Sequence, residues 1–96
     1  MELKELLGVI GQYKNAHGEE FAIKRIGVFG SAAREAINED SDIDIVIESD
    51  QPDLFLLTRI QSDLSEVLER RVDIVRKRES MNDLLKRRIE RDAVYV

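Results

Sequence analysis

The sequence predicts an α/β (α+β) fold, in which helices pack on a small mixed β-sheet. The chain has 96 residues, enough for one domain with one hydrophobic core. Segments with apolar residues at three- and four-residue spacing alternate with short runs rich in Ile and Val, as expected for helices and strands in turn. No repeat, low-complexity stretch or long linker divides the sequence. We therefore expect residues 1–96 to form a single domain.

Two helices are expected around the first strand. Leucine and isoleucine residues at helical spacing predict a helix over 3–16, which ends at His17 with Gly18 as its C′ residue. We expect a structural role for His17, because a histidine in the last helical turn complements the helix dipole. A short helix is predicted over 32–37, followed by a polar loop over 38–41.

Two further helices are expected in the second half of the chain. The longest is predicted over 54–69, and Asp53 just before it is a helix-start signal. The sequence from Ser80 to Asp83 resembles a capping box and predicts a last helix that extends to about Arg91. The residues of the longest helix expected in the core are Phe55, Leu57, Ile60, Leu64, Val67 and Leu68.

Four strands complete the prediction, over 23–29, 43–48, 72–75 and 93–96. Candidate site residues follow the end of the first strand, at Gly30 and Ser31, and lie at the start of the second and third strands, at Asp42, Asp44 and Asp73. For them to meet, the first strand must run antiparallel to the second, and the third parallel to the second. The helix between the second and third strands is then an ordinary right-handed crossover.

Two aspartates one residue apart open the second predicted strand. Alternate side chains of a strand point to opposite faces, so Asp42 and Asp44 share one face while the isoleucines of the run 41–47 share the other. For the same reason Asp73 points away from the core in the third strand. Such carboxylates suit hard cations, and two metal ions commonly assist nucleotidyl transfer. We therefore predict that these three aspartates are catalytic and bind Mg²⁺, at two sites, and that Asp73 takes the acceptor's proton.

A glycine-serine turn before them suits a nucleotide phosphate. Gly30 allows backbone N–H groups to approach closely, Ser31 adds a hydroxyl, and Arg34 one turn later can reach the same phosphates. Taken alone, each residue has a simpler explanation. Ser31 suits a helix N-cap, Arg34 a surface ion pair, Asp42 a turn, and Asp44 the edge of a sheet. The joint pattern favours the phosphate site.

Composition excludes several other classes. The chain has no cysteine, which excludes disulfides and thiolate chemistry. No run is long enough to span a membrane, so we expect a cytoplasmic protein without membrane contact. The net charge of −5 argues against general nucleic-acid binding. Residues 1–69 carry six basic and fifteen acidic side chains, whereas 70–96 carry nine and five, so the basic end could meet phosphates or an acidic partner, or form a solvated helix face.

Three segments together resemble a known family. They are Gly-Ser-Ala-Ala-Arg at 30–34, Ser-Asp-Ile-Asp at 41–44 and the strand aspartate at 73, and they are similar to the minimal nucleotidyltransferase (MNT) domains of the DNA polymerase β-like superfamily. The resemblance extends over nearly the whole chain. It implies the nucleotidyltransferase fold and ATP as substrate. It also implies triphosphate binding by Gly30 and Ser31, with Arg34 as a further contact, and Mg²⁺ binding by the three aspartates.

The resemblance also implies a biological role. Stand-alone members of this size are similar to antitoxins encoded beside HEPN-domain ribonuclease toxins. By this likeness the chain transfers AMP from ATP to a tyrosine of its partner toxin, within a hetero-oligomer and without direct nucleic-acid contact. Two alternatives stay open. One is an antitoxin that acts by stoichiometric binding without catalysis, and the other is a nucleotidyltransferase for small molecules of the aminoglycoside type, which the lack of a second domain disfavours.

Overall fold

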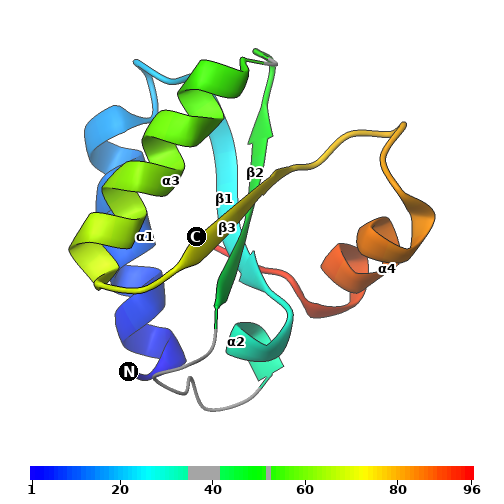
Figure 1. Cartoon of the computed structure of the whole chain (residues 1–96), viewed down its shortest axis with the longest axis horizontal. Helices are drawn as coiled ribbons and strands as arrows, with labels where there is room; N and C mark the ends of the chain where they lie inside the picture. The colour runs from blue at the N-terminus through cyan, green and yellow to red at the C-terminus, as the bar shows by residue number, and fades with distance from the viewer. Residues whose placement is uncertain (35–41, 52) are drawn as a thin grey trace.

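The computed structural model describes residues 1–34, 42–51 and 53–96, so the predictions for 35–41 lie outside the described residues. Helices and strands follow one another along the chain (Figure 1). They are α1 (Leu3–His17), β1 (Ile23–Phe29), α2 (Ser31–Arg34), β2 (Ile43–Ser49), α3 (Leu54–Leu68), β3 (Val72–Arg76), α4 (Asp83–Asp92) and β4 (Val94–Tyr95). Every helix and strand expected from the sequence is present within the described residues. The predicted end of the helix over 32–37 lies outside them, and the other ends differ from their predictions by at most a few residues.

The four strands form one mixed sheet in the order β3-β2-β1-β4. β1 pairs antiparallel with β2, and β2 pairs parallel with β3, which confirms the predicted directions. The last strand adds antiparallel to the free edge of β1, where Gly27 lies opposite Tyr95. The end of β1 and the beginnings of β2 and β3 therefore lie at the same edge of the sheet.

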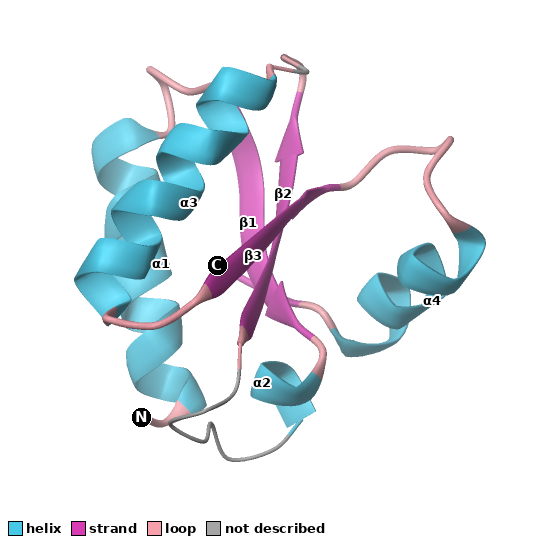
Figure 2. Ribbon diagram, in the orientation of Figure 1, coloured by secondary structure: helices cyan, strands magenta, loops and turns pink. Residues whose placement is uncertain are grey.

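The two long helices, α1 and α3, cover one face of this sheet (Figure 2). Both bring fully buried leucine and isoleucine side chains onto the alternating isoleucines of β2, as the strand pattern predicts. The helices are also joined by Tyr13, whose hydroxyl donates to Asp63 Oδ2 at 2.7 Å. Burial, together with this hydrogen bond, raises the pKa of Tyr13 above its ordinary range.

The opposite face carries a smaller apolar cluster beneath α4. Ile89 of α4 and Met81 just before the helix pack against Phe29 of β1 and Val46 of β2. Asp44 lies two residues before Val46 and therefore points to this same face. α4 thus lies beside the end of the sheet where the candidate residues are found (Figure 1).

Side-chain caps fix where two of the helices begin. The Asp53 carboxylate accepts the N–H groups of Phe55 and Leu56 at 2.9 and 3.4 Å, which confirms the start signal before α3. The capping box predicted from Ser80 is wrong. The side chain of Asn82 accepts the first free N–H groups of α4 at 3.0 and 3.2 Å, so the helix begins at Asp83.

The end of α1 also differs from its prediction in detail. The helix ends at His17, but Gly18 keeps a right-handed conformation, with φ of −57°, and the left-handed residue of this turn is Ala22, with φ of 53°. The His17 ring stacks on Phe21 with centroids 5.1 Å apart, in keeping with a structural role. Backbone hydrogen bonds close the turn, among them Phe21 N–H to the His17 carbonyl at 2.9 Å and Ile23 N–H to the Gly18 carbonyl at 2.8 Å, and no left-handed glycine takes part.

Two apolar residues predicted in the core of α3 lie at the surface instead. Phe55 is 88% exposed and Val67 is 63% exposed. The face of the helix that packs on the core holds Ile60, Leu64 and Leu68 at four-residue spacing. Among the described residues, no helix combines the length and the apolar character that a membrane span needs.

We expect Gly27→Ala to destabilise the protein by about 1–3 kcal/mol, because a forced contact in a packed region shifts its neighbours. A Cβ at this position of β1 would lie 2.6 Å from the Val94 carbonyl oxygen of β4. Gly8→Ala is the matched control, since a Cβ there meets nothing within 4 Å. Urea unfolding of both variants checks this, and equal stability of Gly27→Ala and the parent chain would contradict the β1–β4 pairing.

Candidate functional site

The corner after β1 is shaped by a glycine, Gly30. Gly30 has a φ of +71°, in the left-handed region that L side chains avoid. A Cβ on Gly30 would lie 2.5 Å from Asp44 Oδ2 and 3.3 Å from Arg88 Nη2. The backbone therefore approaches a carboxylate and a guanidinium at one point. Ser31 follows as the first residue of α2 and is exposed.

Two of the candidate aspartates lie side by side across the parallel strands. Asp44 is the register partner of Asp73, so the two side chains emerge on the same face from backbones about 4.8 Å apart. Asp42 lies two residues before Asp44 and is exposed. Asp73 is also exposed, whereas the Asp44 side chain is only 24% accessible. The structure thus brings all three toward the edge of the sheet that holds Gly30.

The electrostatics of Asp44 show that these carboxylates act on one another. Burial raises the pKa of Asp44, and the negative charges of Asp73 and Asp42 raise it further. The guanidinium of Arg88 opposes them, with Nη2 3.7 Å from Asp44 Oδ2. A positive charge at this corner is therefore favourable for the fold.

Arg88 is the residue that sequence reasoning did not single out. It lies on α4, and its guanidinium carbon is 5.7 Å from the centre of the Phe29 ring. In the sequence it is one of several basic residues near the end of the chain, next to Arg87. The sequence near Arg88 does not distinguish it from Arg87. Only the orientation of α4 on the sheet, in which Ile89 is buried, shows which arginine faces Asp44.

Arg34 forms an ion pair with an aspartate that is not one of the three candidate site residues. Its Nε is 3.4 Å from Oδ2 of Asp92, at the end of α4. Arg91 also holds this carboxylate, through two hydrogen bonds of 2.9 and 3.0 Å. The Arg34 side chain is half exposed, so part of its guanidinium is accessible to a ligand while Asp92 competes for it.

The aspartates suit a hard divalent cation in donor type and in charge. All their donors are oxygens, and the pKa of Asp44 is raised first by burial and then by the charges of Asp73 and Asp42, which a cation would offset. As the side chains stand, however, no group of three or more His, Cys, Asp or Glu within 1–34, 42–51 and 53–96 is arranged to hold a metal ion. Arg88 lies against Asp44 instead. Metal binding by all three aspartates therefore requires that they turn and that Arg88 withdraws.

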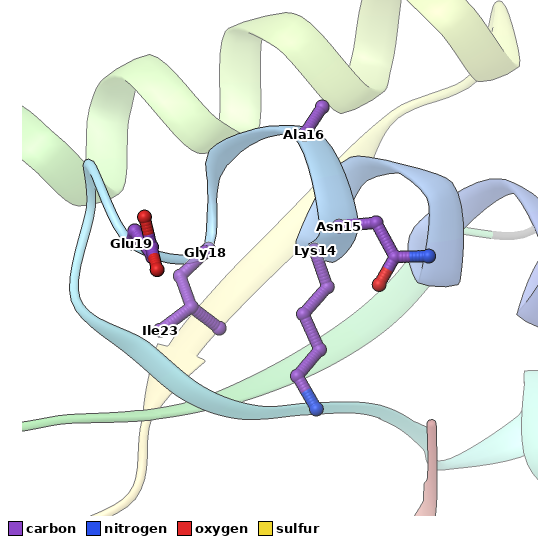
Figure 3. A pocket seen from close by; sticks show the side chains of 6 residues that line it. All are labelled: Lys14, Asn15, Ala16, Gly18, Glu19 and Ile23. Atoms are coloured by element: carbon purple, nitrogen blue, oxygen red, sulfur yellow. The ribbon is translucent and has the colours of Figure 1, made fainter.

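A surface hollow elsewhere does not contain any of these residues. It has a volume of about 390 Å³ and is lined by residues of α1, the following turn and the start of β1 (Figure 3). Ile23 in this hollow opens β1, whereas Gly30 follows its end, about 20 Å away along the strand. Lys14, which Figure 3 shows reaching toward the sheet, donates to the Val96 carbonyl oxygen at 3.1 Å. The hollow is therefore separate from the candidate site.

A mixed sheet that brings a glycine turn to paired strand aspartates is typical of enzymes that transfer phosphate-bearing groups. The chain belongs to the nucleotidyltransferase domain family, whose model matches residues 10–96. It is similar to "Putative protein adenylyltransferase MJ0126" of Methanocaldococcus jannaschii, with 36% identity over 98% of this chain and 97% of that protein. It is also similar to "Protein adenylyltransferase MntA" of Thermococcus cleftensis, with 33% identity over 100% of this chain and 97% of that protein.

Solved structures support the fold. One described as "Structure of putative minimal nucleotidyltransferase" has a TM-score of 0.77 and 28% identity, and the match covers 98% of this chain and 95% of that chain. The resemblance to MNT domains is thereby confirmed. A chain of the complex of a tri-AMPylated Shewanella oneidensis HEPN toxin with an MNT antitoxin has a TM-score of 0.59 and 19% identity, over 88% of this chain and 69% of that chain. At that identity the likeness concerns the fold alone.

We expect Asp44→Asn to leave the metal-free protein at least as stable as the parent chain at neutral pH. A carboxyl whose pKa is raised in the folded state adds stability below its unfolded value of 3.8 and loses it as the pH rises through the folded value. The advantage of the variant should therefore appear above about pH 4 and disappear below it. Urea unfolding across this range is the measurement.

The matched control for this prediction is Glu66→Gln, which makes the same change of charge at an exposed position of α3. We expect little pH dependence in its stability difference, because surface charges far from partners contribute little. A marked loss of stability in Asp44→Asn at neutral pH would show that the Asp44 carboxylate supports the fold, and would contradict a pKa raised by burial and by neighbouring negative charges.

We expect Gly30→Ala to destabilise the protein by about 1–2 kcal/mol, the usual cost of a left-handed conformation in a residue with a Cβ. The added methyl group would also press on the Asp44 carboxylate. Gly11→Ala is the control, since a Cβ on that residue of α1 stays 3.9 Å from its nearest neighbour in Val96. Thermal and urea unfolding test both, and an unchanged stability of Gly30→Ala would rule out a left-handed corner that closes on Asp44.

Proposed function

We propose that this chain is a Mg²⁺-dependent protein adenylyltransferase that transfers AMP from ATP to a tyrosine of a HEPN-type ribonuclease toxin, and so acts as the antitoxin of that partner. One observation carries the proposal. The in-register carboxylates of Asp44 and Asp73 lie at the edge of the sheet where the Gly30 backbone closes on Asp44. This corner offers backbone N–H groups for phosphate beside oxygen ligands for a metal.

The relatives support the choice of acceptor. Two proteins named as protein adenylyltransferases match over nearly their full length. One chain in the complex of a tri-AMPylated HEPN toxin with an MNT antitoxin has the same fold as this chain. The reaction belongs in the cytoplasm, where ATP is available, and requires neither a nucleic acid nor a membrane.

Each candidate residue has a part in binding. The triphosphate lies at Gly30 and Ser31, where the absence of a side chain on Gly30 lets phosphate oxygens reach the backbone. Arg34 is a further phosphate contact once it exchanges Asp92 for the ligand. Asp42, Asp44 and Asp73 hold Mg²⁺, at two sites. When bound, Mg²⁺ neutralises the triphosphate and makes the α-phosphorus more electrophilic.

The transfer itself needs one proton acceptor. The hydroxyl oxygen of the partner's tyrosine forms a bond to the α-phosphorus, and the bond from that phosphorus to the oxygen bridging to the β-phosphate breaks. Pyrophosphate leaves with the electron pair, and the AMP group becomes a tyrosine phosphodiester. Asp73 takes the phenol proton, since its side chain is exposed at the start of β3 and an incoming protein can reach it.

A non-catalytic antitoxin is the second candidate. It is favoured by the arrangement of the side chains as they stand, in which Arg88 lies against Asp44 and no three carboxylates of the described residues are arranged around a metal site. In that case the chain neutralises its partner by stoichiometric binding. The two candidates differ in whether Asp44 and Asp73 are needed.

We expect α-labelled ATP and Mg²⁺ to label a HEPN-type partner, and Asp44→Asn or Asp73→Asn to reduce the rate about a hundredfold or more, because metal and base assistance is lost. The readouts are the label on the partner and its intact mass, with peptide mass spectrometry to identify the tyrosine. Asp50→Asn is the control, since Asp50 follows the far end of β2 and pairs with Lys24 at the surface.

Ribonuclease activity of the partner separates the two candidates. If the variant with all three aspartates changed to asparagine neutralises the ribonuclease as well as the parent chain does, the binding role is correct and the catalytic one fails. If labelling continues at the full rate in Asp44→Asn, the proposed metal site is wrong. Loss of labelling together with loss of neutralisation supports the adenylyltransferase.

A further inference from the structure

Three groups from separate parts of the chain meet at the corner of the sheet. They are the backbone of Gly30 at the end of β1, the carboxylate of Asp44 in β2 and the guanidinium of Arg88 in α4. The Cβ position of Gly30 lies within 3.3 Å of Arg88 Nη2 and 2.5 Å of Asp44 Oδ2. The space that a side chain on Gly30 would fill is therefore bordered by both a positive and a negative group.

The backbone of Arg88 is fixed by packing, whereas its side chain is partly exposed. The next residue, Ile89, is fully buried and fixes this turn of α4 on the sheet. The guanidinium lies near the face of the Phe29 ring, yet the side chain is 48% exposed. An arginine whose backbone is fixed and whose guanidinium is partly exposed can change partners by side-chain rotation, without movement of its helix.

A divalent cation on Asp44 Oδ2 competes with this guanidinium, whose Nη2 is 3.7 Å from the same oxygen, because two positive charges at such short range repel. If Asp44 takes a metal ion, Arg88 loses its carboxylate partner while its backbone stays in place. The nearest new partner is a phosphate at the Gly30 corner, and a guanidinium matches a phosphate with two parallel hydrogen bonds.

We propose that Arg88 binds the triphosphate of the nucleotide and that, before nucleotide arrives, it neutralises Asp44 in place of the metal. This inference rests on the proposed function and adds a phosphate-binding residue from α4 to the Gly30, Ser31 and Arg34 set. Arg88 thereby has opposite effects on two ligands. It opposes a bare cation at Asp44, and it favours a cation that arrives with a triphosphate.

The neighbouring arginine offers a matched control. Arg87 lies one residue earlier on the same helix and is exposed, and the change Arg87→Gln removes the same charge from the same region. A general effect of net charge would act equally on Arg87→Gln and Arg88→Gln. An effect of the contact with Asp44 would act on Arg88→Gln alone.

The experiment measures two dissociation constants for each variant by calorimetry, that of Mn²⁺ alone and that of the Mg²⁺ complex of α,β-methylene-ATP, which keeps the triphosphate but blocks transfer. For Arg88→Gln we expect Mn²⁺ to bind about threefold more tightly, since a competing ion pair to Asp44 is gone. We expect the nucleotide complex to bind about tenfold more weakly, since a charged hydrogen-bond donor to phosphate is lost. Arg88→Lys, which keeps the charge without the fork, should fall between, and it serves as the test if Arg88→Gln does not fold.

The outcomes separate this inference from the function on which it rests. If the parent chain fails to bind the nucleotide complex, the proposed function itself is overturned. If the parent chain binds and the Arg88 variants bind both ligands as it does, or if both affinities fall together, Arg88 is a surface or structural residue and the inference fails. If Arg87→Gln reproduces the changes, they come from net charge and the inference also fails. Only opposite shifts confined to Arg88 support it.

Discussion

The parallel pairing of β2 with β3 is the constraint on which the candidate site depends. It pairs Ile43 with Val72, and this register places the next residues, Asp44 and Asp73, opposite each other. Both of these apolar residues are fully buried. A shift of the register by one residue would turn Asp73 into the core and expose its apolar neighbours. The hydrophobic core therefore fixes the distance between two carboxylates that repel each other.

That repulsion explains why α4 matters beyond its apolar contacts. The pKa of Asp44 is raised by burial and by Asp73 and Asp42, and within the described residues the opposing charge comes from Arg88. The helix carrying Arg88 is seated by Ile89 on the second face of the sheet, next to Phe29. One helix thus covers an apolar surface and supplies a cation to the edge of the sheet. The same arrangement makes the helix a participant in any exchange of ligands at that edge.

Membership of the nucleotidyltransferase family and the geometry of the corner support each other. The family match covers most of the chain, and the glycine with positive φ, the paired strands and the aspartate register all lie within it. What differs from a ready metal site is the orientation of the side chains, with Arg88 on Asp44 and Arg34 on Asp92. In both pairs the guanidinium is about half exposed, whereas the carboxylate is largely covered by the protein.

Most of the fold could be predicted from the sequence, because its signals are local. The alternation of Asp and Ile around Asp44 predicted a strand and its buried face, and the apolar spacing of the long helices predicted their positions. The details that failed depend on where neighbouring elements lie. Phe55 is apolar but lies on the exposed side of α3, away from the face that holds Ile60, Leu64 and Leu68. Ser80 resembles a cap, but the side chain of Asn82 caps α4 instead.

By itself, the sequence determined the order of helices and strands, the faces of the strands and the aspartates that open β2 and β3, since each follows from residues within a few positions of one another. Only the tertiary structure decided that Arg88, rather than Arg87 or Arg34, lies on Asp44. The rotation of α4 on the sheet selects which arginine reaches the corner, and that rotation is set by the packing of Ile89 against residues more than forty positions earlier in the chain.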